Sequence, residues 1–216
     1  MKQTKSLLFA LIIWFSSIAI VMAQETGVVQ LPAPDTSGGK PLMSVFNQRC
    51  SQRNYSDRPL SLQTLSNLLW AANGINRPDS GKRTAPTAMN DQEIDVYVAT
   101  TEGAYLYDHV KHCLLPIHSN DVRAKMGVQG FVKDAPIVLV YVADYKRMSK
   151  LMSKEDKNFY AATDVGFVSQ NVYLFCASEG LATVVIGMVS RNNAAKALNL
   201  TEHQKIILTQ CVGYSK

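Results

Sequence analysis

The sequence lacks the short motifs that mark several large enzyme classes. It contains no GxSxG, no GxGxxG and no GxxxxGK[ST], which are signatures of α/β-hydrolases, classical dinucleotide-binding folds and P-loop nucleotidases. Histidine is scarce, with 4 residues in 216, and only His109 and His112 lie close together. The sequence around them is strand-like, and a three-residue gap on a strand puts the two rings on opposite faces. We therefore predict no metal site.

Paired cysteines are also missing. The 4 cysteines lie far apart and form no CxxC motif. Cys176 lies in an apolar helical pattern and Cys211 in an apolar strand, so both are expected to be buried thiols. A disulfide between Cys50 and Cys113 is the alternative for these two residues, and nothing in the sequence supports or excludes it.

A long apolar run occurs only at the N-terminus. Residues 1–23 combine the basic Lys2 and Lys5 with an apolar stretch and a small-residue cleavage pattern that ends at Ala23, which predicts a secretory signal peptide. An uncleaved membrane anchor is the alternative, but the run is short of the roughly 20 apolar residues that a span requires. We expect an exported protein, periplasmic or secreted, without stable membrane insertion after cleavage.

The mature chain has little excess charge. Removing Lys2 and Lys5 from 22 basic residues leaves 20, against 17 acidic residues. A nearly neutral chain is not expected to bind nucleic acid. Residues 24–40 are rich in Pro, Gly, Ser and Thr and predict an extended or mobile tether. The remaining residues, 41–216, have the length of a single domain.

Apolar periodicity predicts a domain of mixed helices and strands. Residues 156–179 form the longest predicted helix, and Gly180 follows as a helix-ending glycine. Residues 136–143 are a continuous β-branched run, typical of a central strand buried on both faces. The apolar face of the long helix is expected to consist of Phe159, Ala162, Val165, Val168, Val172 and Phe175.

The other predicted elements are shorter. Ser61 is expected to cap a helix that ends near Asn73 and Gly74, and residues 101–103 form a hairpin turn. Residues 77–91 predict a long loop, which in a compact domain is usually functional or disordered. Further helices are predicted at residues 41–48, 120–126 and 192–198, and further strands at residues 94–100, 104–110, 111–117, 182–186 and 205–212.

Arg49, Ser51 and Arg53 alternate in a segment that follows the first predicted helix. In an extended backbone, a spacing of two sends all three side chains to one side. Two guanidinium groups and a hydroxyl on one face suit a phosphate or another delocalised anion. From spacing alone, a solvated basic loop is the commoner interpretation.

Five segments occur in a recognisable order: Arg49-Cys50-Ser51-Gln52-Arg53, the loop from Pro86 to Gln92, Glu179-Gly180-Leu181, Val184-Val185-Ile186-Gly187-Met188, and Cys211-Val212-Gly213-Tyr214. In these segments the chain resembles the FMN-dependent nitroreductase family, in particular exported bacterial members and the branch related to azoline-forming dehydrogenases. The resemblance implies an α+β fold, with a central, mostly antiparallel sheet flanked by helices, and an intertwined homodimer with FMN at the interface.

The resemblance also assigns roles to individual residues. It implies that Arg49 and Ser51 hold the FMN phosphate and that Arg53 reaches the pyrimidine edge of the flavin. Lys216 would stand in for basic phosphate ligands that other members place beyond the final glycine. The partner-lent loop would comprise Pro86, Thr87, Met89 and Asn90, and the residues at the flavin ring would be Gln129, Val185, Ile186 and Gly187.

The implied activity is reduction of nitroaromatic, quinone or similar acceptors by ping-pong hydride transfer through flavin N5. No side chain needs to act as acid or base, so no catalytic residue is expected. NAD(P)H or a protein would donate the electrons. Glu93-Ile94 replaces a Pro-Trp pair of well-known members, which predicts a different substrate pocket. A flavin-binding or storage protein without turnover, and a dehydrogenase acting on a peptide-derived ring, are the alternative functions.

Overall fold

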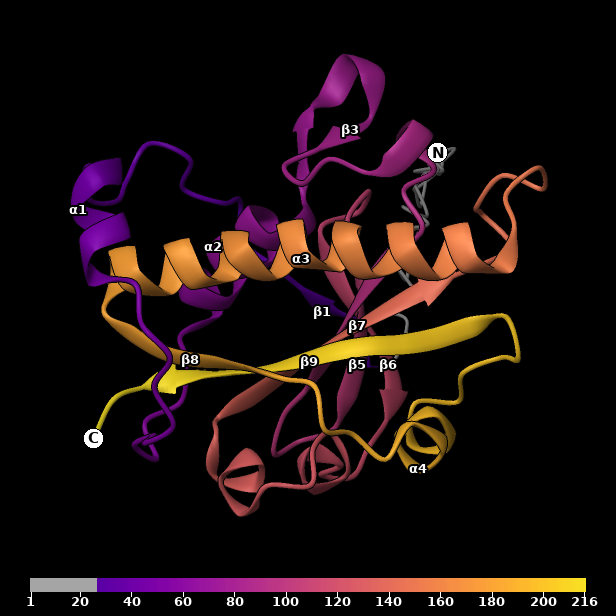
Figure 1. The fold of residues 1–216 in the computed structure, drawn as a ribbon. Coiled ribbons are helices and arrows are strands. Elements are labelled where there is room, and N and C mark those ends of the chain that lie inside the picture. The colour runs from indigo at the N-terminus through magenta and orange to yellow at the C-terminus, as the bar shows by residue number, and fades with distance from the viewer. Residues whose placement is uncertain (1–26) are drawn as a thin grey trace, which may run out of the picture.

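A computed structural model describes residues 27–216 (Figure 1). The predicted signal peptide, residues 1–23, lies outside the described residues. Within residues 27–216, no helix is both long enough and apolar enough to cross a membrane.

A seven-stranded sheet organises the domain, in the order β1-β6-β5-β4-β7-β9-β8. Every neighbouring pair in this sheet is antiparallel, and β2 pairs antiparallel with β3 as a separate small hairpin. The predicted α+β class is therefore confirmed. The strands are β1 (Val29–Gln30), β2 (Ile75–Arg77), β3 (Lys82–Arg83), β4 (Ile94–Ala99), β5 (Ala104–Asp108), β6 (Cys113–His118), β7 (Ile137–Asp144), β8 (Leu181–Ile186) and β9 (Gln204–Tyr214).

Helices and short turns cover both faces of this sheet. Figure 1 shows α3 crossing one face beside α1 and α2, with α4 on the opposite side. The helices are α1 (Leu42–Gln48), α2 (Leu62–Asn73), α3 (Lys154–Glu179) and α4 (Arg191–Ala197). Four short 3-10 helices complete the helical elements of the described residues: η1 (Pro78–Ser80), η2 (Ala88–Asn90), η3 (Arg123–Lys125) and η4 (Gly130–Asp134).

Strand β7 is the central strand that the β-branched run predicts. Successive residues contribute to two different apolar cores, one on each face of the sheet. Leu139 and Tyr141 pack in the core beneath α2 and α3, whereas Val138 and Val140 pack in the core on the α4 side. Because both faces are covered, apolar residues at every position are favoured over alternation.

Local capping signals place the helix ends correctly. The Ser61 hydroxyl accepts a hydrogen bond from the Thr64 amide at 3.0 Å, which begins α2 as predicted. Gly180 ends α3 in the left-handed conformation with φ 71°, where a side chain would cost free energy.

The predicted apolar face of α3 is wrong at its N-terminal end. Phe159 is 65% exposed and Ala162 is also exposed, whereas Ala161 and Val165 are buried. The first predicted positions are three residues apart. Each residue advances about 100° around the helix, so three residues advance about 300°, and each such step falls about 60° short of a full turn. The series from Phe159 therefore rotates off the face that meets the sheet.

The described part of residues 24–40 packs on the domain. Val29 pairs with Leu114 in β6, and Leu31 is buried in the core beneath α2 and α3. Further along, the Lys40 amide donates to the Ser178 hydroxyl at 2.9 Å. The segment is extended, and it completes one edge of the sheet.

Residues 109–112 form a turn, so the strands predicted at 104–110 and 111–117 are shorter than expected. The Asp108 carboxylate accepts hydrogen bonds from the Val110 and Lys111 amides at 2.9 Å each, which fixes the turn. His112 bonds Ser66 through one ring nitrogen. In the described part of the chain no cluster of His, Cys, Asp and Glu could hold a metal ion.

The cysteines follow the predicted burial. Cys176 and Cys211 are both fully buried, and burial raises the pKa of the Cys211 thiol to about 12. Cys50 is exposed, whereas Cys113 is buried in β6.

The β4–β5 hairpin depends on Gly103. A Cβ atom at this position would lie 2.2 Å from the carbonyl oxygen of His118. We expect Gly103→Ala to lower the free energy of unfolding by about 2 kcal/mol, because main-chain atoms must move to relieve the overlap. Urea unfolding measures the change. Gly130→Ala is the matched control, since the space around Gly130 is open, and an equal loss in both variants would contradict the explanation.

Candidate functional site

Residues 49–55 run along the outer edge of β8. The Gln52 amide donates to the Thr183 carbonyl at 2.9 Å, and Tyr55 forms an isolated bridge with Ser215. The Tyr55 hydroxyl also donates to the Gln52 carbonyl at 3.0 Å. The segment is therefore held extended between the edge strand and the C-terminal residues.

Tyr173 of α3 connects this segment to β8. Its hydroxyl lies 2.9 Å from the Ser51 hydroxyl and accepts a hydrogen bond from the Val185 amide at 3.0 Å. The guanidinium of Arg49 lies 5.3 Å from the centre of the Tyr173 ring, within cation–π range. The Tyr173 side chain thus positions both Arg49 and Ser51, the two residues that the resemblance assigns to the FMN phosphate.

The sequence-based prediction missed Tyr173. An aromatic residue within a helical apolar pattern is normally assigned to the core, but this ring is only half-buried. The sequence did contain one signal for this position. Tyr173 lies about two turns before Gly180, where α3 ends and the chain turns directly into β8, so its side chain is close to that strand.

The three alternating side chains differ in their exposure. Arg49 is half-buried against Tyr173, whereas Ser51 and Arg53 are exposed. Two guanidinium groups and a hydroxyl within five residues provide the hydrogen-bond donors that a phosphate or another anion requires.

The main chain leaves the edge of β8 after Val185. The Thr183 carbonyl and the Val185 amide both point outwards from β8, towards Gln52 and Tyr173. Strand β8 ends at Ile186, and Gly187 follows it directly. Gly187 and Met188 are exposed, and Ile186 is buried.

Gln129 lies next to this edge. The Val128 amide donates to the Met188 carbonyl at 3.1 Å, and Gly127 lies against Ile186. The side-chain oxygen of Gln129 is buried and has no donor among the described residues. Leaving such an acceptor unpaired costs free energy, so the position suits a ligand that can donate a hydrogen bond.

The loop that contains Pro86, Thr87, Met89 and Asn90 lies elsewhere on the chain. The Ala88 amide donates to the Asp164 carboxylate at 2.9 Å, which anchors the loop on α3. Tyr173 is nine residues further along the same helix, or roughly 13 Å at 1.5 Å per residue. One chain therefore presents the Arg49 segment and this loop at two separate places.

The loop backbone is strained. Met89, Asn90 and Gln92 have φ values of 54°, 59° and 50°, in the left-handed region that side chains disfavour. Met89 is nevertheless 72% exposed. Strain of this kind persists where the surroundings hold it, and it concentrates at binding sites.

Lys216 is exposed at the C-terminus. It lines a cavity of about 660 Å³ together with Tyr55, Asp57 and Pro136. A smaller cavity of about 180 Å³ lies at Gln52 and Tyr173. The structure thus brings Arg49, Ser51 and Val185 together through Tyr173, and places Lys216 in the lining of the larger cavity.

This antiparallel α+β fold, with an arginine-bearing segment along the edge of β8, defines a nitroreductase-like protein. The sequence model of the Nitroreductase family matches residues 47–214, and the chain belongs to that family.

Known proteins agree with this assignment. The protein MJ1384 of Methanocaldococcus jannaschii, which is described as a nitroreductase, is 32% identical over 191 residues, and these cover 83% of this chain and 94% of that protein. A solved structure from Ralstonia eutropha JMP134, also described as a nitroreductase, is 42% identical, with a TM-score of 0.84, and the match covers 88% of this chain and 90% of that one. A nitroreductase-type structure from Desulfovibrio desulfuricans in complex with FMN shares the fold at 20% identity, with a TM-score of 0.58 and coverage of 82% and 88%.

Tyr173→Phe tests whether the Tyr173 hydroxyl positions the site. Removing it leaves Ser51 and the Val185 amide without their common partner. We expect FMN affinity to fall by about fivefold, corresponding to roughly 1 kcal/mol for lost hydrogen bonds. Fluorescence titration measures this affinity. Tyr160→Phe is the control, because Tyr160 lies on the same helix outside this site; equal affinities of Tyr173→Phe and the unmodified protein would contradict the role.

Proposed function

We propose that the protein is an FMN-dependent oxidoreductase that reduces nitroaromatic, quinone or similar acceptors. The observation that carries this proposal is the chain of contacts from Arg49 and Ser51 through Tyr173 to the Val185 amide. It joins an anion-binding end to an exposed main-chain edge, as a phosphate-bearing ring cofactor requires. The FMN complex of the Desulfovibrio protein, which has the same fold, supports this choice of cofactor.

The residues present suit the two ends of FMN. Arg49 and Ser51 would hold the phosphate through charge-assisted hydrogen bonds, and Tyr173 keeps both in place. Arg53 would lie at the pyrimidine edge, where its positive charge favours the reduced, anionic flavin. The buried oxygen of Gln129 would accept a hydrogen bond from the ring.

FMN, when bound, would supply hydride acceptance and donation at N5. The main-chain amide of Gly187 would orient that edge of the ring, and no protein side chain would need to transfer a proton. The neighbouring Met188 and Val128 are 66% and 58% exposed and would present an apolar surface to an aromatic acceptor.

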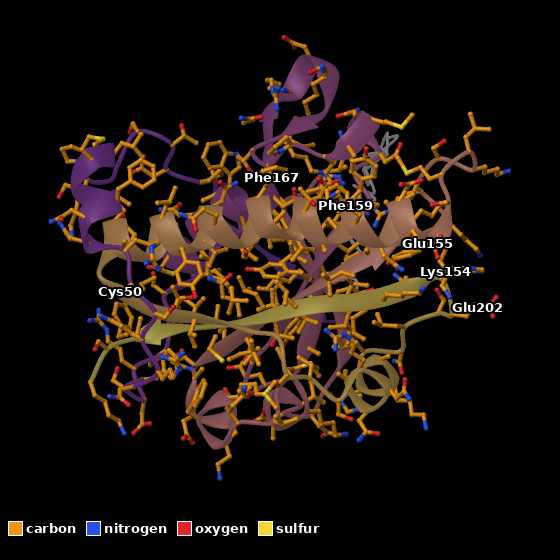
Figure 2. All side chains as sticks on the ribbon, in the orientation of Figure 1. Cys50, Lys154, Glu155, Phe159, Phe167 and Glu202 are labelled. Carbon is orange, nitrogen blue, oxygen red and sulfur yellow. The ribbon has the colours of Figure 1, made fainter. Side chains whose placement is uncertain are left out.

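We also propose a homodimer in which the loop from Pro86 to Asn90 reaches the FMN of the partner subunit. Within one chain this loop and the Arg49 segment are separated along α3, so the site is incomplete without a second copy. Figure 2 shows Phe159 and Phe167 on α3, and both side chains are exposed. Leu42, Met43 and Phe46 of the adjacent α1 are exposed as well. Apolar exposure of this extent is typical of a protein interface.

Flavin binding and turnover distinguish the proposed enzyme from a flavin-storage protein. We expect the purified protein to take up FMN at about one per chain and to show the absorbance bands of oxidised flavin. NAD(P)H or dithionite should bleach the bands, and a quinone or nitroaromatic should restore them. A protein that takes up no FMN on titration contradicts the proposal, and bound flavin that reacts with no acceptor indicates storage.

Export is a separate proposal, because the predicted signal lies outside the described residues. We expect cleavage after Ala23, so that mass spectrometry of the protein recovered from the native compartment gives a chain that begins at Gln24. NAD(P)H is a cytoplasmic reductant, so an exported enzyme would take electrons from another protein. An intact N-terminus on the mature protein would contradict cleavage.

A further inference from the structure

Glu93 is an acidic residue buried next to the loop from Pro86 to Gln92. It is 0% exposed, and neither of its carboxyl oxygens has a donor among the described residues. Its carboxyl group contacts that of Asp164 in α3, which is 2% exposed. An ionised carboxylate can only accept hydrogen bonds, so these two groups can bond only when one of them carries a proton.

The two nearby guanidinium groups donate hydrogen bonds to other acceptors, while the Nε atom of each is buried without a hydrogen-bond partner among the described residues. Arg147 pairs with Asp95 at 2.6 Å and donates to the main-chain carbonyl of Glu93 at 2.7 Å. Arg83 donates to the main-chain carbonyl of Ile94 at 2.9 Å, and its second terminal nitrogen lies 3.0 Å from the Nε2 atom of His109. Neither guanidinium makes a hydrogen bond to the side chain of Glu93.

The remaining neighbours add to the negative charge. Asp91 lies close enough to disfavour ionisation of Glu93, and its carboxylate accepts a hydrogen bond from the Ser149 amide at 3.0 Å. Tyr145 lies within electrostatic range of Glu93 but is neutral, because burial raises the pKa of its hydroxyl. Burial, followed by the charges of Asp164 and Asp91, raises the pKa of Glu93 to about 7.

Asp164 links this pair to the loop. Its other contact is the hydrogen bond from the Ala88 amide at 2.9 Å, so the carboxyl that meets Glu93 also holds the loop on α3. Two of the strained residues, Met89 and Asn90, follow directly. A loop with a strained backbone requires such an anchor to remain in one conformation.

We propose that Glu93 and Asp164 are positioning residues that hold the 86–92 loop on α3 through one shared proton. With the proton present, the two carboxyls bond and Asp164 is fixed beneath Ala88. Without it, two buried carboxylates repel each other and the loop is released. Neither residue touches the reacting atoms. The consequence for FMN, which the partner's loop would then cover less well, rests on the proposed function.

The direction of the pH effect follows from proton linkage. The anchored loop binds the proton of Glu93 more tightly than the released loop, in which the exposed carboxyl returns to its ordinary pKa. Anchoring is therefore strongest in acid, weakens by roughly five- to sevenfold for each pH unit between about 5 and 7, and levels off above that range.

Hydrogen–deuterium exchange of the flavin-free, full mature chain tests this anchor between pH 5 and 8, with each rate divided by its intrinsic value. We expect protection of residues 86–92 to fall by roughly 40-fold from pH 5 to pH 7. Glu93→Gln supplies a permanent donor of similar shape, so its protection should stay constant over the same range. Glu102→Gln, on an exposed turn, is the matched control and should behave like the unmodified protein, with helix α4 as an internal reference.

An unmodified protein with pH-independent protection, or a Glu93→Gln variant that keeps the full pH dependence, would overturn the proposal. Should Glu93→Gln fail to fold, Asp164→Asn asks the same question, because its amide can donate to Glu93 while its oxygen accepts from Ala88. FMN affinity at pH 5 and pH 7 is the second readout. A chain that binds no FMN at either pH contradicts the proposed function, whereas the exchange result still decides on the anchor.

Discussion

Arg49→Ala is expected to weaken FMN binding by about 10- to 100-fold, the range of roughly 1.5–3 kcal/mol for a charge-assisted hydrogen bond. The guanidinium is already placed against Tyr173, so binding would require little ordering of this side chain. Alanine removes both the charge and the donors of Arg49 from the proposed phosphate site and leaves Ser51 without its cationic neighbour. Fluorescence titration with FMN at fixed ionic strength measures the loss.

Two further variants make this result specific. Arg49→Lys keeps the charge but not the planar pair of donors, so its affinity for FMN should lie between those of the unmodified protein and Arg49→Ala. Arg58→Ala is the matched control, since the Arg58 guanidinium stacks on the Tyr214 ring at 4.0 Å and is not part of the proposed phosphate site. If Arg49→Ala binds FMN as tightly as Arg58→Ala does, Arg49 is not a phosphate ligand.

The parts of the fold that local chemistry determines could be predicted from the sequence. Ser61 begins a helix and Gly180 ends one because each satisfies a requirement of the helix terminus itself. The β7 run was recognised because burial on both faces removes alternation. The exposed side of α3 could not be predicted in this way, since Phe159 is apolar and the local sequence does not distinguish a buried apolar position from an exposed one.

Contacts between distant residues explain what the sequence could not reveal at the site. The segment from Arg49 to Arg53 was recognisable by its composition, and the structure places it at the edge of β8. Tyr173 acquires its role only when α3 returns the chain to that edge. The contact of Glu93 with Asp164 likewise joins the start of β4 to the middle of α3, and two acidic residues so far apart in the sequence give no local signal.

Phe159→Lys is expected to convert the proposed dimer largely to monomers. Phe159 is 65% exposed on α3, and an aromatic side chain buried at an interface typically contributes about 2–4 kcal/mol. A two-fold interface contains the substitution twice. We therefore expect the dimer dissociation constant to rise by at least about 100-fold. Light scattering coupled to size-exclusion chromatography, over a dilution series, measures the change.

Lysine is chosen because it tests the interface without weakening the helix. Glu155 lies four residues before Phe159 in α3, and Figure 2 shows both at the same end of the helix. A Glu–Lys pair at this spacing stabilises a helix, so the monomer should remain folded. Leu151→Lys is the control, because Leu151 is 96% exposed and lies outside α3. Phe159→Lys should also retain less FMN, since each proposed site includes the partner's loop. A variant that remains dimeric at every concentration removes this face of α3 from the proposed interface.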